Sequence, residues 1–94
     1  MNYLVAYDVR SNKKRRRLSE YLIDKGLIRI QMSVFIGEID SKKIVKFKEN
    51  IKEFINIETD SLYCIPISKE EYEKIFTIGK NVDYKLYEKD IFYI

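Results

Sequence analysis

The sequence predicts a single α+β domain with the ferredoxin-like order β-α-β-β-α-β, and three observations predict it. Apolar runs and amphipathic stretches alternate in that order along the 94 residues. Only short polar or glycine-containing breaks separate them, with no repeat and no low-complexity linker. A composition of 46% hydrophobic and 14% aromatic residues supplies a core and excludes a disordered chain. In this fold two helices cover one face of a four-stranded antiparallel sheet and leave the other face open.

Residues 3–9 are mostly apolar and predict the first strand. Ser11 or Asn12 then caps a helix, since short polar side chains accept hydrogen bonds from the free N–H groups of a first turn. This helix runs to about Lys25 and stops at Gly26, a residue suited to the left-handed position after a helix.

Two short strands are expected next, at residues 27–31 and 34–39. Met32 and Ser33 stand between them and predict a tight reversal.

A second helix is expected from Asp40 or Ser41 to about Asn56. Its apolar residues fall three or four positions apart, which is the spacing of one helix face. They are Ile44, Phe47, Ile51, Phe54 and Ile55.

Residues 61–67 predict a fourth strand. Pro66 places this strand at a sheet edge, because proline has no N–H to donate to the ladder. Ser68 and Glu71 then have the spacing of a capping box before a helical turn through Phe76.

We divide the domain, residues 1–94, into a core at 1–78 and a linker with a C-terminal strand at 79–94. The last residues, Ile91 to Ile94, are apolar after a polar stretch. Such a chain end satisfies its backbone and side chains by joining a sheet edge, its own or a partner's. A domain this small also gains from oligomerisation, so we expect a homodimer.

Basic residues are concentrated near the N-terminus: residues 1–37 have a charge balance of +5 and residues 38–94 a balance of −2. Five consecutive cations stand at the start of the first helix: Lys13, Lys14, Arg15, Arg16 and Arg17. Each opposes the helix dipole at a cost of about 0.3 to 1 kcal/mol. A run of five also goes round the helix and cannot all be one solvated face. We therefore expect it to bind an anion, for which a nucleic-acid backbone is suited.

Asp8, just before these cations, is the only carboxylate among the first nineteen residues. One carboxylate is a poor magnesium site, although a two-fold axis would supply a second. Asp8 is also suited to ending the strand by accepting hydrogen bonds from the next turn. Because the chain has no histidine, any hydrolysis would depend on a metal-activated water and on arginine.

Three motifs stand in the first part of the chain: Tyr7-Asp8-Val9, then Arg15 and Arg17 ahead of Leu18, then the run from Gly26 to Phe35 with Arg29, Gln31 and Ser33. Together they resemble the signature of the CRISPR-associated protein 2 family. The motifs cover about the first 39 residues. Beyond them, only the element order and the strand end Ile65-Pro66-Ile67 agree.

The resemblance implies a homodimer whose sheets face one another, with the C-terminal strand exchanged onto the neighbouring subunit. It implies a role in spacer acquisition, in which the dimer bridges dimers of the CRISPR-associated integrase (protein 1 family) and holds duplex DNA by its backbone. An alternative activity is also implied: a magnesium-dependent endonuclease, or a toxin-like interferase, that cleaves single-stranded RNA. One Mg²⁺ would be shared by Asp8 of each subunit near the dimer axis.

The resemblance associates five further positions with activity: Tyr7, Arg15, Arg17, Arg29 and Phe35. Strand alternation sets Arg29 on one face with Leu27 and Gln31. If that is the open face, Arg29 lies in the dimer interface, where an ion pair with Asp8 is as well supported as contact with nucleic acid. Residues such as Tyr7 and Phe35 are more often core residues than residues that stack on a ligand.

Arg10, Ser11 and Asn12 replace the acidic residues usual in that family after the Tyr-Asp pair, which favours binding over catalysis. A small-molecule regulatory domain of this fold would need a ligand pocket and would not explain the five cations. An RNA-recognition module would need a glycine-spaced aromatic motif that the sequence lacks. With no run near the roughly 20 apolar residues of a membrane span, we expect a cytoplasmic protein.

Overall fold

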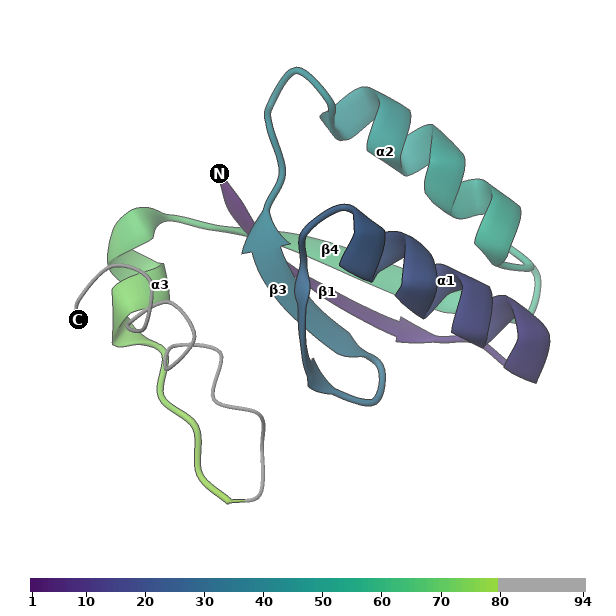
Figure 1. The fold of residues 1–94 in the computed structure, drawn as a ribbon, viewed down its shortest axis with the longest axis horizontal. Helices are drawn as coiled ribbons and strands as arrows, with labels where there is room; N and C mark the ends of the chain where they lie inside the picture. The colour runs from purple at the N-terminus through teal and green to yellow at the C-terminus, as the bar shows by residue number, and fades with distance from the viewer. Residues whose placement is uncertain (80–94) are drawn as a thin grey trace.

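The computed structural model describes residues 1–79 (Figure 1). Their elements are β1 (Asn2–Asp8), α1 (Asn12–Asp24), β2 (Ile28–Gln31), β3 (Val34–Glu38), α2 (Ile44–Ile51), the 3-10 turn η1 (Lys52–Phe54), β4 (Ser61–Ile67) and α3 (Lys69–Lys74). The predicted order and fold class are confirmed. The predicted C-terminal strand and its exchange lie outside the described residues.

The four strands form one antiparallel sheet in the order β2-β3-β1-β4. β1 is central and pairs Val5 with Phe35 of β3 and with Cys64 of β4. Among the described strands β4 is at an edge, as Pro66 predicted, and β2 is at the other. This order brings the end of β1, the site of Asp8, beside the start of β4.

The ends of α1 follow the sequence closely. The Ser11 side chain accepts a hydrogen bond from the Lys14 N–H at 3.2 Å. Gly26 adopts a φ of 92° after the helix. Its N–H donates to the Ile23 carbonyl at 2.9 Å, and the Leu27 N–H donates to the Leu22 carbonyl at 3.0 Å. These are the two bonds of a Schellman motif, which turns the chain directly into β2.

The second helix is shorter than predicted at both ends. Residues 41–43 form a turn, in which the Asp40 carboxylate accepts the Lys42 N–H at 2.9 Å. Because the side chain of Asp40 closes this turn, regular helix begins only at Ile44. After Ile51 the chain tightens into η1, and Ile55 is extended, so the α-helix ends at Ile51 and not at about Asn56. The capping box of α3 is present, but that helix ends at Lys74.

One face of the sheet is covered by α1 and α2 (Figure 1). The core there includes Val5, Leu18, Leu22, Phe35, Phe47 and Ile51. On the other face, α3 covers one end, where Tyr72 packs with Ile36. The rest of that face stays exposed in the single chain, with Ile65 at 50% and Tyr63 at 65%. In the part of the chain described, no helix is long and apolar enough to cross a membrane.

Candidate nucleic-acid interface and carboxylate site

Tyr7 and Asp8 are neighbours in β1 but point to opposite faces of the sheet, since strand residues alternate. Tyr7 is 7% exposed in the core beneath the helices. Asp8 is exposed on the open face, where the ladder pairs it with Ser61 of β4. The residues predicted as a catalytic set are therefore divided between two surfaces.

The Asp8 carboxylate has no hydrogen bond or ion pair within residues 1–79. The structure thus does not show the turn contacts that the alternative role required. Asp60 holds this turn instead: its Oδ1 accepts the Arg10 N–H at 3.2 Å and its Oδ2 accepts the Asn56 N–H at 2.8 Å. The Asn56 hydrogen bond is the main reason that the pKa of Asp60 is lowered. Asp60 was not predicted from the sequence. The pattern that could have indicated its role is a polar turn that ends in an aspartate just before a strand.

Within the described residues, no group of three or more Asp, Glu or Cys side chains lies close enough to hold a metal ion. Mg²⁺ requires near-octahedral oxygen coordination. One copy of Asp8 does not fit that requirement, so a magnesium site at this position needs ligands from a second chain.

Arg29, Phe35 and Tyr7 form a row across β2, β3 and β1 on the helix-covered face. The ladder pairs Arg29 with Phe35, and the Arg29 guanidinium carbon lies 5.2 Å from the Phe35 ring centroid. The Phe35 and Tyr7 ring centroids are 6.2 Å apart at an interplanar angle of 20°. Arg29 therefore lies on the helix-covered face, so the condition for its place in the dimer interface, that its face is the open one, is not met in this chain. It points away from Asp8 of its own chain. In β2 the apolar residues Ile28 and Ile30 lie on the face opposite Arg29, so strand alternation did not reveal that the helices cover the side that carries the arginine.

The Tyr7 hydroxyl is buried and makes no hydrogen bond to the described residues. Burial raises the pKa of Tyr7, while the charge of Arg29, a weak interaction of its guanidinium with the hydroxyl, and the charge of Arg15 lower it to a smaller extent. Tyr7 is thus a neutral core residue whose hydroxyl has the Arg29 guanidinium nearby but no partner at normal hydrogen-bond geometry. Such a group costs stability.

The basic cluster, residues 13–17, occupies the first turns of α1, where the first turn holds no acidic residue. Lys13, Arg16 and Arg17 are exposed, whereas Lys14 and Arg15 are partly buried. The Arg15 guanidinium donates to the Val9 carbonyl at 2.7 Å and also to the Asn12 side-chain oxygen. The cluster therefore divides into cations that face solvent and an arginine that ties α1 to the end of β1.

Residues 1–75 match the family model described as CRISPR associated protein Cas2. A relative from Korarchaeum cryptofilum, named CRISPR-associated endoribonuclease Cas2, is 32% identical over 84 residues, which cover 85% of this chain and 86% of the relative. A protein of the same name from Geobacter sulfurreducens is 31% identical over 83 residues, covering 86% of each chain. The crystal structure of Streptococcus pyogenes Cas2 at pH 6.5 has a TM-score of 0.76 at 28% identity, and the match covers 84% of this chain and 100% of that chain.

The matched region contains every motif on which the resemblance was based and all described strands. Sequence, fold and relatives agree, so the resemblance is confirmed. The chain belongs to the Cas2 family of CRISPR-associated proteins.

Proposed function

We propose that the chain is the nucleic-acid-binding subunit of CRISPR spacer acquisition, a homodimer that bridges CRISPR-associated integrase dimers and holds protospacer DNA by its backbone. The observation that carries this proposal is the start of α1. Lys13, Arg16 and Arg17 are exposed there, and no acidic residue in the first turn offsets them. Lys13 lies in the first turn and opposes the helix dipole, while Arg16 and Arg17 extend the positive surface into the next turn. A DNA backbone presents closely spaced phosphates that can neutralise all three cations.

The open sheet face supports the homodimer. Tyr63 and Ile65 are largely exposed on β4, and the ladder sets Ala6 and Leu4 of β1 beside them. A contiguous apolar surface of this kind marks an interaction site. Pairing two such faces would bury both and join two basic clusters in one assembly.

Duplex binding measured against salt concentration tests the proposal. The triple variant Lys13→Gln, Arg16→Gln, Arg17→Gln should bind every duplex sequence more weakly. Its salt slope, the slope of log binding constant against log salt concentration, should fall in magnitude by about 1 for each lost phosphate contact. Lys69→Gln is the matched control, because Lys69 begins α3 at the other end of the molecule (Figure 1). A triple variant with the affinity and slope of the wild type would remove the basis of the proposal.

A second candidate function is endoribonuclease activity, which the names of the relatives and the position of Asp8 favour. Pairing two open faces would bring two exposed Asp8 carboxylates into one interface. A Mg²⁺ bound between them would stabilise charge on the scissile phosphate. In this arrangement Tyr7, Arg29 and Phe35 would act from the opposite face, by fixing β1 against β3.

Asp8→Asn separates the two functions because it removes the charge and keeps the size of the side chain. Under the first proposal, duplex binding and association with the integrase survive this substitution. Under the second, Mg²⁺-dependent cleavage of single-stranded RNA is lost. Cleavage that persists in Asp8→Asn would overturn the second function, and loss of duplex binding would contradict the first.

A further inference from the structure

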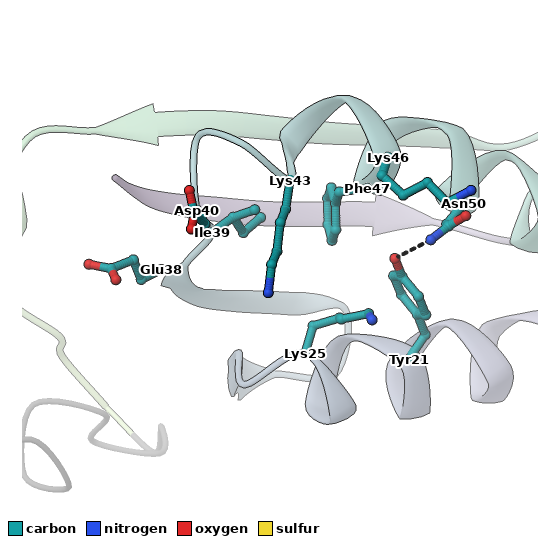
Figure 2. A pocket seen from close by; sticks show the side chains of 9 residues that line it. All are labelled: Tyr21, Lys25, Glu38, Ile39, Asp40, Lys43, Lys46, Phe47 and Asn50. Carbon is teal, nitrogen blue, oxygen red and sulfur yellow. Dashed lines mark hydrogen bonds between the residues drawn. The ribbon is translucent and has the colours of Figure 1, made fainter.

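A cavity of about 520 Å³ lies between the C-terminal half of α1 and the start of α2 (Figure 2). Tyr21 lines it from α1 and Lys25 from the position just after α1. Lys43 lines it from the turn before α2, and Phe47 and Asn50 line it from α2. The cavity is on the helix side of the sheet, away from Asp8 and the open face. Neither candidate function makes use of it.

Three lysines bring positive charge to this cavity, one from the end of α1 and two from α2 and the turn before it. Lys25, Lys43 and Lys46 all line it. No ion pair involves any of the three among residues 1–79, although the Lys25 ammonium lies 5.4 Å from the Tyr21 ring centroid. In Figure 2, Lys43 extends from the turn before α2 toward α1. The start of α2 adds to the positive potential, because it has no side-chain cap and no acidic residue in its first turn.

Hydrogen-bond donors stand at one end of the cavity. The Asn50 side-chain amide donates to the Tyr21 hydroxyl oxygen at 3.1 Å. This bond uses one amide hydrogen and a lone pair of the phenol. The phenol hydrogen and the second amide hydrogen have no acceptor among the described residues. Both hydrogens can therefore be donated to a ligand oxygen or to water.

The remaining walls differ in character. Ile39 and Phe47 are 7% and 5% exposed and form an apolar base. Glu38 and Asp40 lie at the end opposite Asn50 (Figure 2). A ligand matched to all of these walls has an anionic group, an apolar middle, and hydroxyl or amino groups that donate to carboxylates.

We propose that this cavity binds a nucleoside monophosphate. Lys25 and Lys43 hold the phosphate together with the Tyr21 and Asn50 donors, and the nucleoside lies over the apolar base with its hydroxyl groups toward Asp40. The volume lies within the roughly 300–1,000 Å³ of small-molecule sites and exceeds the needs of a free phosphate. The two carboxylates disfavour an acidic peptide. A duplex backbone would leave the apolar base unused.

Titration of the isotope-labelled full chain with adenosine monophosphate, followed by amide chemical shifts, tests this proposal. Shifts should concentrate at Tyr21, Lys43 and Asn50. Lys43→Gln should raise the dissociation constant about tenfold, as expected for one charge-assisted hydrogen bond to phosphate. Lys42→Gln is the matched control: its side chain is exposed, neighbours Lys43 and does not line the cavity. This variant should bind as the wild type does.

Adenosine and inorganic phosphate form the comparison arms, and each should bind more weakly than the monophosphate. Equal binding of either fragment would overturn the assignment of a nucleoside monophosphate. Two results would show that the monophosphate is attracted to positive charge in general and would overturn the proposed site. One is amide shifts confined to residues 13–17, and the other is a Lys42→Gln variant that binds as weakly as Lys43→Gln. Duplex binding to Lys43→Gln provides a further check. If this substitution weakens duplex binding by the same factor as monophosphate binding, the cavity is part of the duplex-binding surface, which also overturns the proposal. Tyr21→Phe is a second variant that keeps the ring and removes the donor, and it should also weaken binding.

Discussion

The guanidinium carbon of Arg29 lies 5.2 Å from the centroid of the Phe35 ring, its partner in the β2–β3 ladder. Phe35 is fully buried, whereas Arg29 is exposed. The arginine therefore covers one side of a core aromatic ring. This places Arg29 with the core beneath the helices, on the face opposite Asp8.

Arg29→Ala should lower the free energy of unfolding by about 1 kcal/mol, because it removes a cation–π contact and the packing of the arginine stem. Arg29→Lys should lose less, since it keeps the charge. Urea unfolding of both variants measures the effect, with Lys69→Ala as an exposed control. Unchanged stability combined with weaker duplex binding would assign Arg29 to the ligand instead.

Tyr7→Phe should raise the free energy of unfolding by about 1 kcal/mol at neutral pH, because it removes a buried hydroxyl that lacks a hydrogen bond. The gain should grow in alkali. Burial raises the pKa of Tyr7 above its ordinary value of 10.0, so the unfolded state ionises first as the pH rises past about 10 and the wild type loses stability. Phenylalanine has no proton to lose. Urea unfolding at neutral and alkaline pH checks both results, and a constant difference between the two proteins would contradict the second.

Arg15 and Arg16 are adjacent in the basic cluster but should respond differently to substitution. Arg15→Gln should lower the free energy of unfolding by about 1 kcal/mol, because it breaks the guanidinium bonds to the Val9 carbonyl and the Asn12 side chain. Arg16→Gln should leave stability unchanged and reduce the salt dependence of duplex binding. Thermal unfolding and binding isotherms of the two variants make the comparison. Equal stability of both would show that the Arg15 contacts are not maintained in solution.

Local chemistry made the element order and the ends of α1 predictable. Ser11 and Gly26 act through bonds within a few residues of themselves, so their roles could be recognised in the sequence. The turn closed by Asp40 also depends on a hydrogen bond between near neighbours. It was not predicted, because the apolar spacing of the following helix suggested that the helix begins at Asp40 or Ser41.

The features that could not be predicted from the sequence depend on contacts between residues that are far apart along the chain. Asp60 reaches a backbone N–H fifty positions earlier, at Arg10. The spacing of apolar residues in α1 does not indicate that the Arg15 side chain donates to the Val9 carbonyl, just after β1. The pairing of Tyr21 with Asn50 depends on the packing of α1 against α2, so the cavity beside it had no sequence signal. Alternation separates Tyr7 from Asp8, but only the tertiary fold decides which of their two faces the helices cover.

Ile65→Glu should convert the proposed homodimer into a monomer without unfolding the chain. Ile65 is 50% exposed on the open face of the single chain, so a charge there is tolerated when that face meets water. In a dimer that pairs two open faces, the same substitution would bury two carboxylates near each other, at a cost of several kcal/mol. Sedimentation velocity measures the mass, and circular dichroism confirms the fold. Glu70→Gln, on the surface of α3, is the control and should leave the mass unchanged. A dimer that survives Ile65→Glu would show that the subunits associate through another surface.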